Sequence, residues 1–278
     1  MKSLLSILRW NLKLTRYLER FFNQIKGFKK LFRYKRIVYT QSEYLLAFNK
    51  EACLKLESIE NLPQINLDSL KGRANGKAFI DLANEYSETV TSIFNKVMCQ
   101  EGVEDFIVGY FNGKPWLWNC ALNYSDPSKQ QTGSQLWHFD YGDTKQLHLM
   151  LYFSKVDEDS GPFTFLPHQY SKMVKRNTFL IERLTDEDLK HRYNYDVKEL
   201  QSKLIGDRGD LFSADPGKLM HQGARAIKPR LVMFITFTTP SPTSHGGKSV
   251  MNGEMRRKLF KAYQEDCKNG ILTKEVFL

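Results

Sequence analysis

Residues 137–167, WHFDYGDTKQLHLMLYFSKVDEDSGPFTFLP, contain the pattern that decides the fold class of this 278-residue chain. Two short apolar and aromatic runs, QLHLMLYFS and PFTFLP, flank an acidic cluster that ends in Gly-Pro. Runs of this length are typical of β-strands, and clusters of Asp, Ser, Gly and Pro are typical of turns. The segment therefore predicts two consecutive strands joined by a turn.

Similar strand-like runs and turn clusters lie on both sides of this segment. There are three further strand-like runs: PWLWNCALNY (115–124), GDLFSA (209–214) and RLVMFITFTT (230–239). Turn clusters separate these runs, for example SDPSKQQTGS (125–134) and ADPGK (214–218). Many short strands with such punctuation indicate a sandwich or barrel. We expect a mainly β fold with flanking helices, an α+β protein, whose jelly-roll core spans about residues 115–240.

Apolar residues at gaps of three and four predict helices outside this core, near residues 76–99 and 253–268. A third helical stretch interrupts the strands near 185–204, and Thr185 with Asp188 has the spacing of a capping box at its start. The stretch from Pro63 to Gly76 is expected to be a loop.

The net charge of +10 comes from the N-terminal segment alone, because residues 1–36 contain eleven Lys or Arg and a single acidic residue, Glu19. Apolar and basic residues recur there on opposite faces of a helical pattern. One interpretation is a helix on an anionic membrane surface, and the other is an aromatic stripe packed on the protein's own core. We expect two parts: the amphipathic segment 1–36 and one domain over 37–278. Nucleic acid is not expected as a partner, because the chain has no nucleic-acid-binding signature.

The four cysteines are widely separated and match no zinc spacing. A domain of this size does not need disulfides, so we expect reduced thiols. No apolar run reaches the ~18 residues of a membrane-spanning helix, and the start lacks the apolar run and cleavage site of a secretory signal. These features predict a cytoplasmic protein. Any membrane contact is expected to be peripheral and to be made by residues 1–36.

His138 and Asp140 form an H-x-D pair within the opening stretch. In an extended segment residues two apart point to the same face, so an imidazole nitrogen and a carboxylate oxygen project together. They supply two-thirds of a 2-His-1-carboxylate facial triad, which leaves adjacent positions on iron open. His221 lies 83 residues further on and is the candidate third ligand. Arg230, nine residues later, begins a strand-like run and could hold a dicarboxylate by a bidentate pair.

Residues 137–167, together with GDLFSADPGKLMHQG (209–223) and Arg230, resemble the phytanoyl-CoA dioxygenase family of 2-oxoglutarate oxygenases. The resemblance implies a double-stranded β-helix and a reaction that uses Fe(II), 2-oxoglutarate and O2 and releases succinate and CO2. By the same resemblance His138, Asp140 and His221 bind iron, and Arg230 binds the far carboxylate of 2-oxoglutarate. A carboxylate at Asp140 favours hydroxylation, because related halogenases have a small residue there.

Two features depart from the family pattern. Pro167-His168-Gln169-Tyr170 stands where many members have Pro-Gly-Ser-His, and the spacing from His221 to Arg230 is shorter than is typical. Arg225 is therefore an alternative anchor for 2-oxoglutarate. Asn119, Asn123 and Gln135 flank the predicted site and could donate hydrogen bonds to the co-substrate.

The substrate is not readable from the sequence beyond a small-molecule, lipid-like or glycan-linked compound. Two other functions stay open. One is a catalytically inactive jelly-roll scaffold at a membrane surface, and the other is a cupin-type metal enzyme that does not use 2-oxoglutarate.

Overall fold

The computed structural model describes residues 43–113, 115–127, 133–140, 143, 145–177, 182–223, 225–239, 251–267, 270, 272 and 276. The amphipathic segment 1–36, and with it the predicted membrane contact, lies outside the described residues. Within the described ranges, no helix combines the length and the apolar character needed to cross a membrane.

Two antiparallel sheets form the centre of the fold. The larger sheet has the strand order β1-β7-β4-β9-β3-β2, and the smaller has the order β6-β5-β8. The strands are β1 (Cys53–Leu56), β2 (Ile80–Asp81), β3 (Trp116–Ser125), β4 (Gln146–Tyr152), β5 (Phe163–Phe165), β6 (Ser202–Leu204), β7 (Leu211–Ala214), β8 (His221–Gln222) and β9 (Arg230–Thr238). From β4 onward the chain passes back and forth between the two sheets, with β4, β7 and β9 in the larger and β5, β6 and β8 in the smaller, which is the topology of a double-stranded β-helix. The predicted jelly-roll fold is confirmed.

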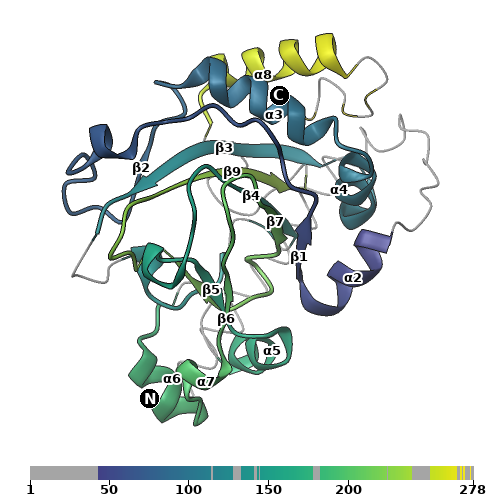
Figure 1. Ribbon diagram of the computed structural model, residues 1–278. Helices are drawn as coiled ribbons and strands as arrows, with labels where there is room; N and C mark the ends of the chain where they lie inside the picture. The colour runs from purple at the N-terminus through teal and green to yellow at the C-terminus, as the bar shows by residue number, and fades with distance from the viewer. Residues whose placement is uncertain are drawn as a thin grey trace.

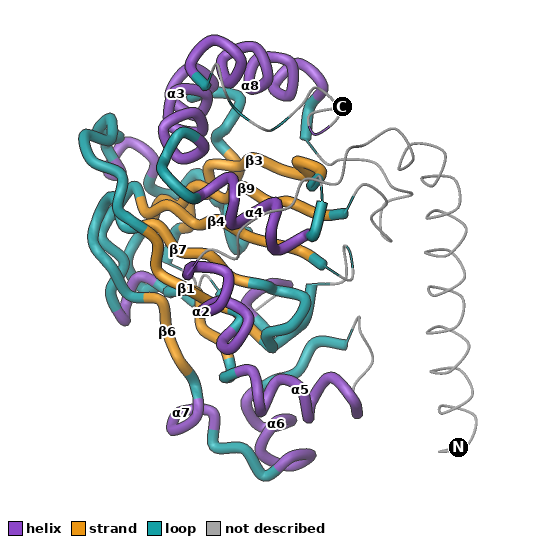
Figure 2. The backbone as a smooth tube through the Cα atoms, turned by 90° about the vertical axis from the view of Figure 1, so that its right-hand side faces the viewer, coloured by secondary structure: helices purple, strands orange, loops and turns teal. Residues whose placement is uncertain are grey.

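Helices cover both outer faces. They are α2 (Glu43–Glu51), α3 (Ser87–Met98), α4 (Val103–Phe111), α5 (His168–Asn177), α6 (Asp186–Tyr193), α7 (Val197–Leu200) and α8 (Gly253–Asp266). Figure 1 shows α3 and α8 above the larger sheet and α5, α6 and α7 beyond the smaller one. The view turned by 90° in Figure 2 shows the same order of layers.

Alternation along β9 decides which side chains face the space between the sheets. Leu231 and Met233 belong to the hydrophobic core beneath α3 and α8, as do Ile235 and Phe237. Because successive residues of a strand point to opposite faces, Arg230, Val232, Phe234 and Thr236 point to the other sheet. β4 follows the same rule, since Leu147, Leu149 and Leu151 join the helix-side core and Gln146, His148, Met150 and Tyr152 face inward.

The smaller sheet has its own outer core. Trp137, Phe139, Leu184 and Met220 are buried together with side chains of α5, α6 and α7. The indole nitrogen of Trp137 donates to the carboxylate of Asp186, 2.6 Å away, at the start of α6. This packing fixes the segment before Asp140, because Trp137 turns outward and its neighbour His138 must turn inward.

Two helix predictions need correction. Within 76–99 only Ser87–Met98 is helical, because Ile80 and Asp81 pair with β3 and the Asp81 carboxylate accepts from the backbone of Leu122. The insert at 185–204 begins with the predicted capping box at Thr185. It ends differently, because Asn194 adopts a left-handed conformation after α6 and Ser202–Leu204 form strand β6. The predicted C-terminal helix is confirmed as α8.

The expectation of reduced thiols is wrong for one pair of cysteines. Cys99, which follows α3, forms a disulfide with Cys267, which follows α8, and 168 residues separate them. Cys53 and Cys120 are free. The disulfide therefore links the C-terminal helix to the helix beside which it packs, and the sequence could not indicate this because the partners are so distant.

Reduction of this disulfide is expected to destabilise the fold by about 2–4 kcal/mol, because it releases a long constrained loop in the unfolded chain. Denaturant unfolding with and without reductant measures the difference. The double variant Cys99→Ala/Cys267→Ala is the control, since reductant should leave its midpoint unchanged. Equal midpoints for oxidised and reduced wild type would contradict the prediction.

Candidate metal centre

Backbone pairing brings His138 and His221 together. The amide of each residue donates to the carbonyl of the other, both at 2.9 Å, in an antiparallel bridge. Residues paired in this way point their side chains to the same face, here the space between the sheets. The two imidazole rings are 4.3 Å apart between centroids.

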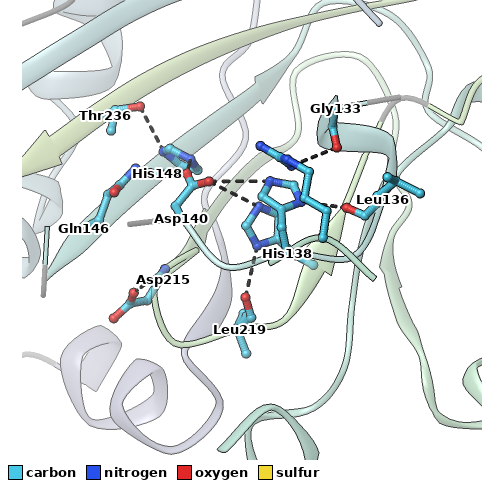
Figure 3. A network of polar contacts seen from close by, with 12 residues as sticks. Gly133, Leu136, His138, Asp140, Gln146, His148, Asp215, Leu219 and Thr236 are labelled. Carbon is cyan, nitrogen blue, oxygen red and sulfur yellow. Dashed lines mark hydrogen bonds and ion pairs between the residues drawn. The ribbon is translucent and has the colours of Figure 1, made fainter. Parts of the chain in front are cut away.

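Each imidazole is oriented by a backbone carbonyl two residues earlier. Nδ1 of His138 lies 2.7 Å from the carbonyl of Leu136, and Nδ1 of His221 lies 3.0 Å from that of Leu219. A carbonyl only accepts, so Nδ1 carries the proton and Nε2 keeps its lone pair. Burial lowers the pKa of His221 to about 3, so this side chain is neutral at physiological pH. Nε2 of both rings lies near the carboxylate of Asp140, which Figure 3 shows beside His138.

The two oxygens of Asp140 have different surroundings. Oδ1 lies 3.5 Å from Nε2 of His138 and 3.9 Å from Nε2 of His221. Oδ2 accepts from Nε2 of Gln146 at 3.0 Å and lies 3.2 Å from Nε2 of His148. Burial raises the pKa of Asp140, but the contacts with the His138 and His148 side chains outweigh this effect and hold the pKa well below its usual range. The carboxylate is therefore ionised, with one oxygen facing the two imidazoles.

His148 has a fixed tautomer as well. Its Nδ1 lies 2.9 Å from the hydroxyl of Thr236 on the neighbouring strand β9. A neutral His148 that accepts from this hydroxyl carries its proton on Nε2 and donates it to Asp140. Thr236, His148 and Asp140 then form one chain of hydrogen bonds, visible at the left of Figure 3.

The three predicted ligands are thus placed at one point. One ligand atom from each of His138, Asp140 and His221 lies within 4.8 Å of the others. Two neutral imidazoles and one carboxylate fit a divalent transition metal, and this ligand set with open positions is typical of non-haem iron(II). The hydrogen bonds on Nδ1 and on Oδ2 are the supporting contacts that such ligands usually have.

Gln146 and His148 were not predicted as site residues. Their spacing on β4 carried a signal, because residues two apart on a strand share a face, as do His138 and Asp140. Their role depends on the pairing of β4 with β9 and on the position of Asp140, which the sequence does not state.

Arg230 lies on the same inward face of β9 as Thr236, at the opposite end of the strand. Its side chain is buried, with 6% of the residue exposed, and burial lowers its pKa to about 10. Among the described residues no carboxylate pairs with it, and its Nε has no hydrogen-bond partner. A buried guanidinium in this state is costly unless an anion binds it.

Two further polar atoms without partners lie near Arg230. Ser125 is directly opposite Arg230 in the pairing of β3 with β9, and Asn123 is opposite Val232. Within the described part of the chain, Oγ of Ser125 and Oδ1 of Asn123 are buried and have no hydrogen-bond partner. Asn123 was predicted for this region and Ser125 was not. Together the three residues form a buried polar cluster on one face of the sheet.

The alternative anchor Arg225 already has an anionic partner. Its guanidinium pairs with Asp186, with Nη1 3.1 Å from the carboxylate, and its Nε donates to the backbone carbonyl of Gln135. Gln135 is buried on the 3-10 turn Gly133–Gln135, ahead of the metal ligands. The predicted contact of Gln135 with a co-substrate stays a prediction.

Comparison with known proteins gives only distant likenesses. No protein-family model matches the chain, and no curated protein matches it. Among solved structures, the non-heme alpha ketoglutarate dependent epimerase SnoN from nogalamycin biosynthesis has 11% identity and a TM-score of 0.47, with 73% of this chain and 85% of that chain covered. EctD from S. alaskensis, with 2-oxoglutarate and 5-hydroxyectoine, has 16% identity and a TM-score of 0.44, with 75% and 79% covered. HygX from Streptomyces hygroscopicus, with nickel and 2-oxoglutarate, has 13% identity and a TM-score of 0.43, with 72% and 87% covered. Similarity of this size does not identify the ligand or the reaction of this chain.

Replacing His148 with alanine is expected to weaken metal binding about 10–100-fold, because Asp140 loses the donor that orients its second oxygen. Titration of the metal-free protein with Co(II), followed by absorption, measures the affinity. His191→Ala is the matched control, because His191 is an exposed histidine on α6. Equal affinities for His148→Ala and wild type would show that Asp140 does not need this contact.

Proposed function

We propose that this protein is an Fe(II)- and 2-oxoglutarate-dependent dioxygenase that hydroxylates a C–H bond of its substrate and releases succinate and CO2. The observation that carries the proposal is the buried Arg230, without an anionic partner among the described residues, in the same space between the sheets as the His138–Asp140–His221 cluster. Hydroxylation is preferred to halogenation because the carboxylate of Asp140 is present.

A dicarboxylate could bind at two points in the space between the sheets. The metal that the three ligands would hold offers one binding point, and the guanidinium of Arg230 offers the other. Between Arg230 and Thr236 the inward residues of β9 are Val232 and Phe234, which give a short carbon chain an apolar surface. Ser125 and Asn123 add a hydroxyl and an amide beside Arg230, and both have unused hydrogen-bonding capacity. This arrangement supports 2-oxoglutarate as co-substrate.

The protein's contribution to the reaction is binding and orientation. Iron(II), when bound, supplies the activation of O2. Backbone carbonyls accept from Nδ1 of His138 and His221 and so turn Nε2 of each ring toward the metal position, and Gln146 and His148 contact the second oxygen of Asp140. Arg230 would fix the far carboxylate of the co-substrate by a charge-assisted pair. The apolar walls limit the access of water to the reacting groups.

The resemblance to the phytanoyl-CoA dioxygenase family supports the same assignment but does not name the substrate. A small-molecule or lipid-like substrate and a peripheral membrane contact through residues 1–36 remain proposals.

His138→Ala is expected to abolish iron-dependent formation of succinate from 2-oxoglutarate, because the metal loses one of its three ligands. Succinate is measured after incubation of pure protein with Fe(II), 2-oxoglutarate and O2, and the anaerobic reaction is the blank. His191→Ala is the control and should keep wild-type turnover. An inactive scaffold would show no turnover in any variant, and equal turnover by His138→Ala and wild type would show that the assigned metal site is not used.

Arg230→Met is expected to weaken 2-oxoglutarate binding about 10–100-fold, because a buried charge-assisted pair contributes about 1.5–3 kcal/mol. The dissociation constant is measured anaerobically on the Co(II)-loaded protein, and circular dichroism confirms that the variant is folded. Arg225→Met is the matched control for the alternative anchor. If Arg225→Met weakens binding and Arg230→Met does not, the anchor is Arg225. A cupin-type enzyme that does not use 2-oxoglutarate would show no binding in wild type.

A further inference from the structure

We infer that Arg183 binds an anionic group of the substrate (a carboxylate, phosphate or sulfate) beside the metal centre. The inference deepens the proposed function and rests on it. It follows from the backbone pairing of Arg183, from its hydrogen bonding and from its exposure.

Backbone pairing places Arg183 next to His138. Leu184 and Trp137 exchange both backbone hydrogen bonds at 2.9 Å in an antiparallel bridge. In an antiparallel pair the next residue on one strand faces the preceding residue on the other, so Arg183 lies opposite His138. Side chains of opposed residues share a face, and their Cβ atoms are typically about 4.5–5.5 Å apart.

The face is the inner one. Trp137 and Leu184 are buried in the outer core beneath α5 and α6. Because side chains alternate along both segments, His138 and Arg183 point the other way, into the space between the sheets. His138 is in turn paired with His221. The inferred position of Arg183 therefore puts Arg183, His138 and His221 in one row across the smaller sheet.

The guanidinium of Arg183 is held in place but not neutralised. Nη1 donates to the carbonyl of Gly133 at 2.8 Å, and the same carbonyl accepts from the backbone amide of Leu136 at 3.3 Å. Within the described ranges no carboxylate pairs with Arg183, whereas the nearby Arg225 pairs with Asp186. The residue is exposed to solvent, so its remaining N–H groups are accessible to a ligand.

Exposure separates the roles of the two inward arginines. Arg230 is buried on the inner face of β9 and suits a co-substrate that is enclosed between the sheets. Arg183 is exposed at the edge of the smaller sheet, beside one metal ligand. An anion on its planar guanidinium would place the rest of that molecule beside the metal, where a C–H bond is to be attacked. The structure therefore favours substrates with a negative charge close to the carbon that reacts.

Paramagnetic relaxation tests the site with small probes. Methyl phosphate, observed by ³¹P NMR, and ¹³C-labelled acetate are titrated into Co(II)-loaded protein under anaerobic conditions, with and without 2-oxoglutarate. Zn(II)-loaded protein is the diamagnetic reference, and line broadening by Co(II) reports that a probe binds near the metal. The variants are Arg183→Gln and, as the matched control, Arg176→Gln, which removes an exposed arginine of α5.

We expect broadening of at least one probe by wild type and by Arg176→Gln, and apparent binding about fivefold or more weaker for Arg183→Gln. A stronger effect on methyl phosphate would identify a phosphate-bearing substrate, and a stronger effect on acetate a carboxylate. Equal broadening by Arg183→Gln and wild type, or no broadening of either probe, would overturn the inference. If 2-oxoglutarate does not change the Co(II) absorption, the proposed function is contradicted. The comparison of Arg183→Gln with wild type does not depend on that result, because it uses the probes alone.

Discussion

The pair of backbone hydrogen bonds between His138 and His221 is the constraint on which the rest of the site depends. It joins two segments that are 83 residues apart and turns both imidazoles to the inner face of the smaller sheet. A slip of one residue would send His138 into the outer core and bring the indole of Trp137 inward. The burial of Trp137 beneath α6, with its indole bonded to Asp186, opposes this slip, so the outer core stabilises the register of the predicted metal ligands.

Hydrogen bonds then fix the orientation of the imidazole rings that this strand register turns inward. Carbonyls of Leu136 and Leu219 select the tautomers of the two histidines, and the carboxylate of Asp140 selects that of His148. Each contact satisfies a polar group that would be costly to leave unpaired in a buried position. The ligand atoms are therefore arranged by the fold itself, and the side chains need little rearrangement when a metal binds.

The sequence predicted the features that local periodicity encodes. Short apolar and aromatic runs between turn clusters revealed the strands of the core, and the spacing of His138 and Asp140 showed that they share a face. Features that depend on cross-strand register were missed, as with Gln146 and His148, which reach Asp140 only through the pairing of β4 with β9. Ser125 was missed because only the pairing of β3 with β9 places it opposite Arg230. The disulfide of Cys99 was missed for a similar reason, since it depends on the packing of α8 on α3.

Two arginines near the site, Arg225 and Arg230, show how the surroundings of a side chain determine what it can bind. Arg225 is neutralised by Asp186 and stabilises the structure around Gln135. Arg230 keeps its charge at neutral pH, since its pKa of about 10 is still well above 7, although it is buried. The fold therefore bears the cost of a desolvated charge until a carboxylate binds. Because such a ligand binds the folded state and not the unfolded chain, its binding free energy adds to the stability of the fold. Under the proposed function, occupancy by the co-substrate and stability are linked through this one residue.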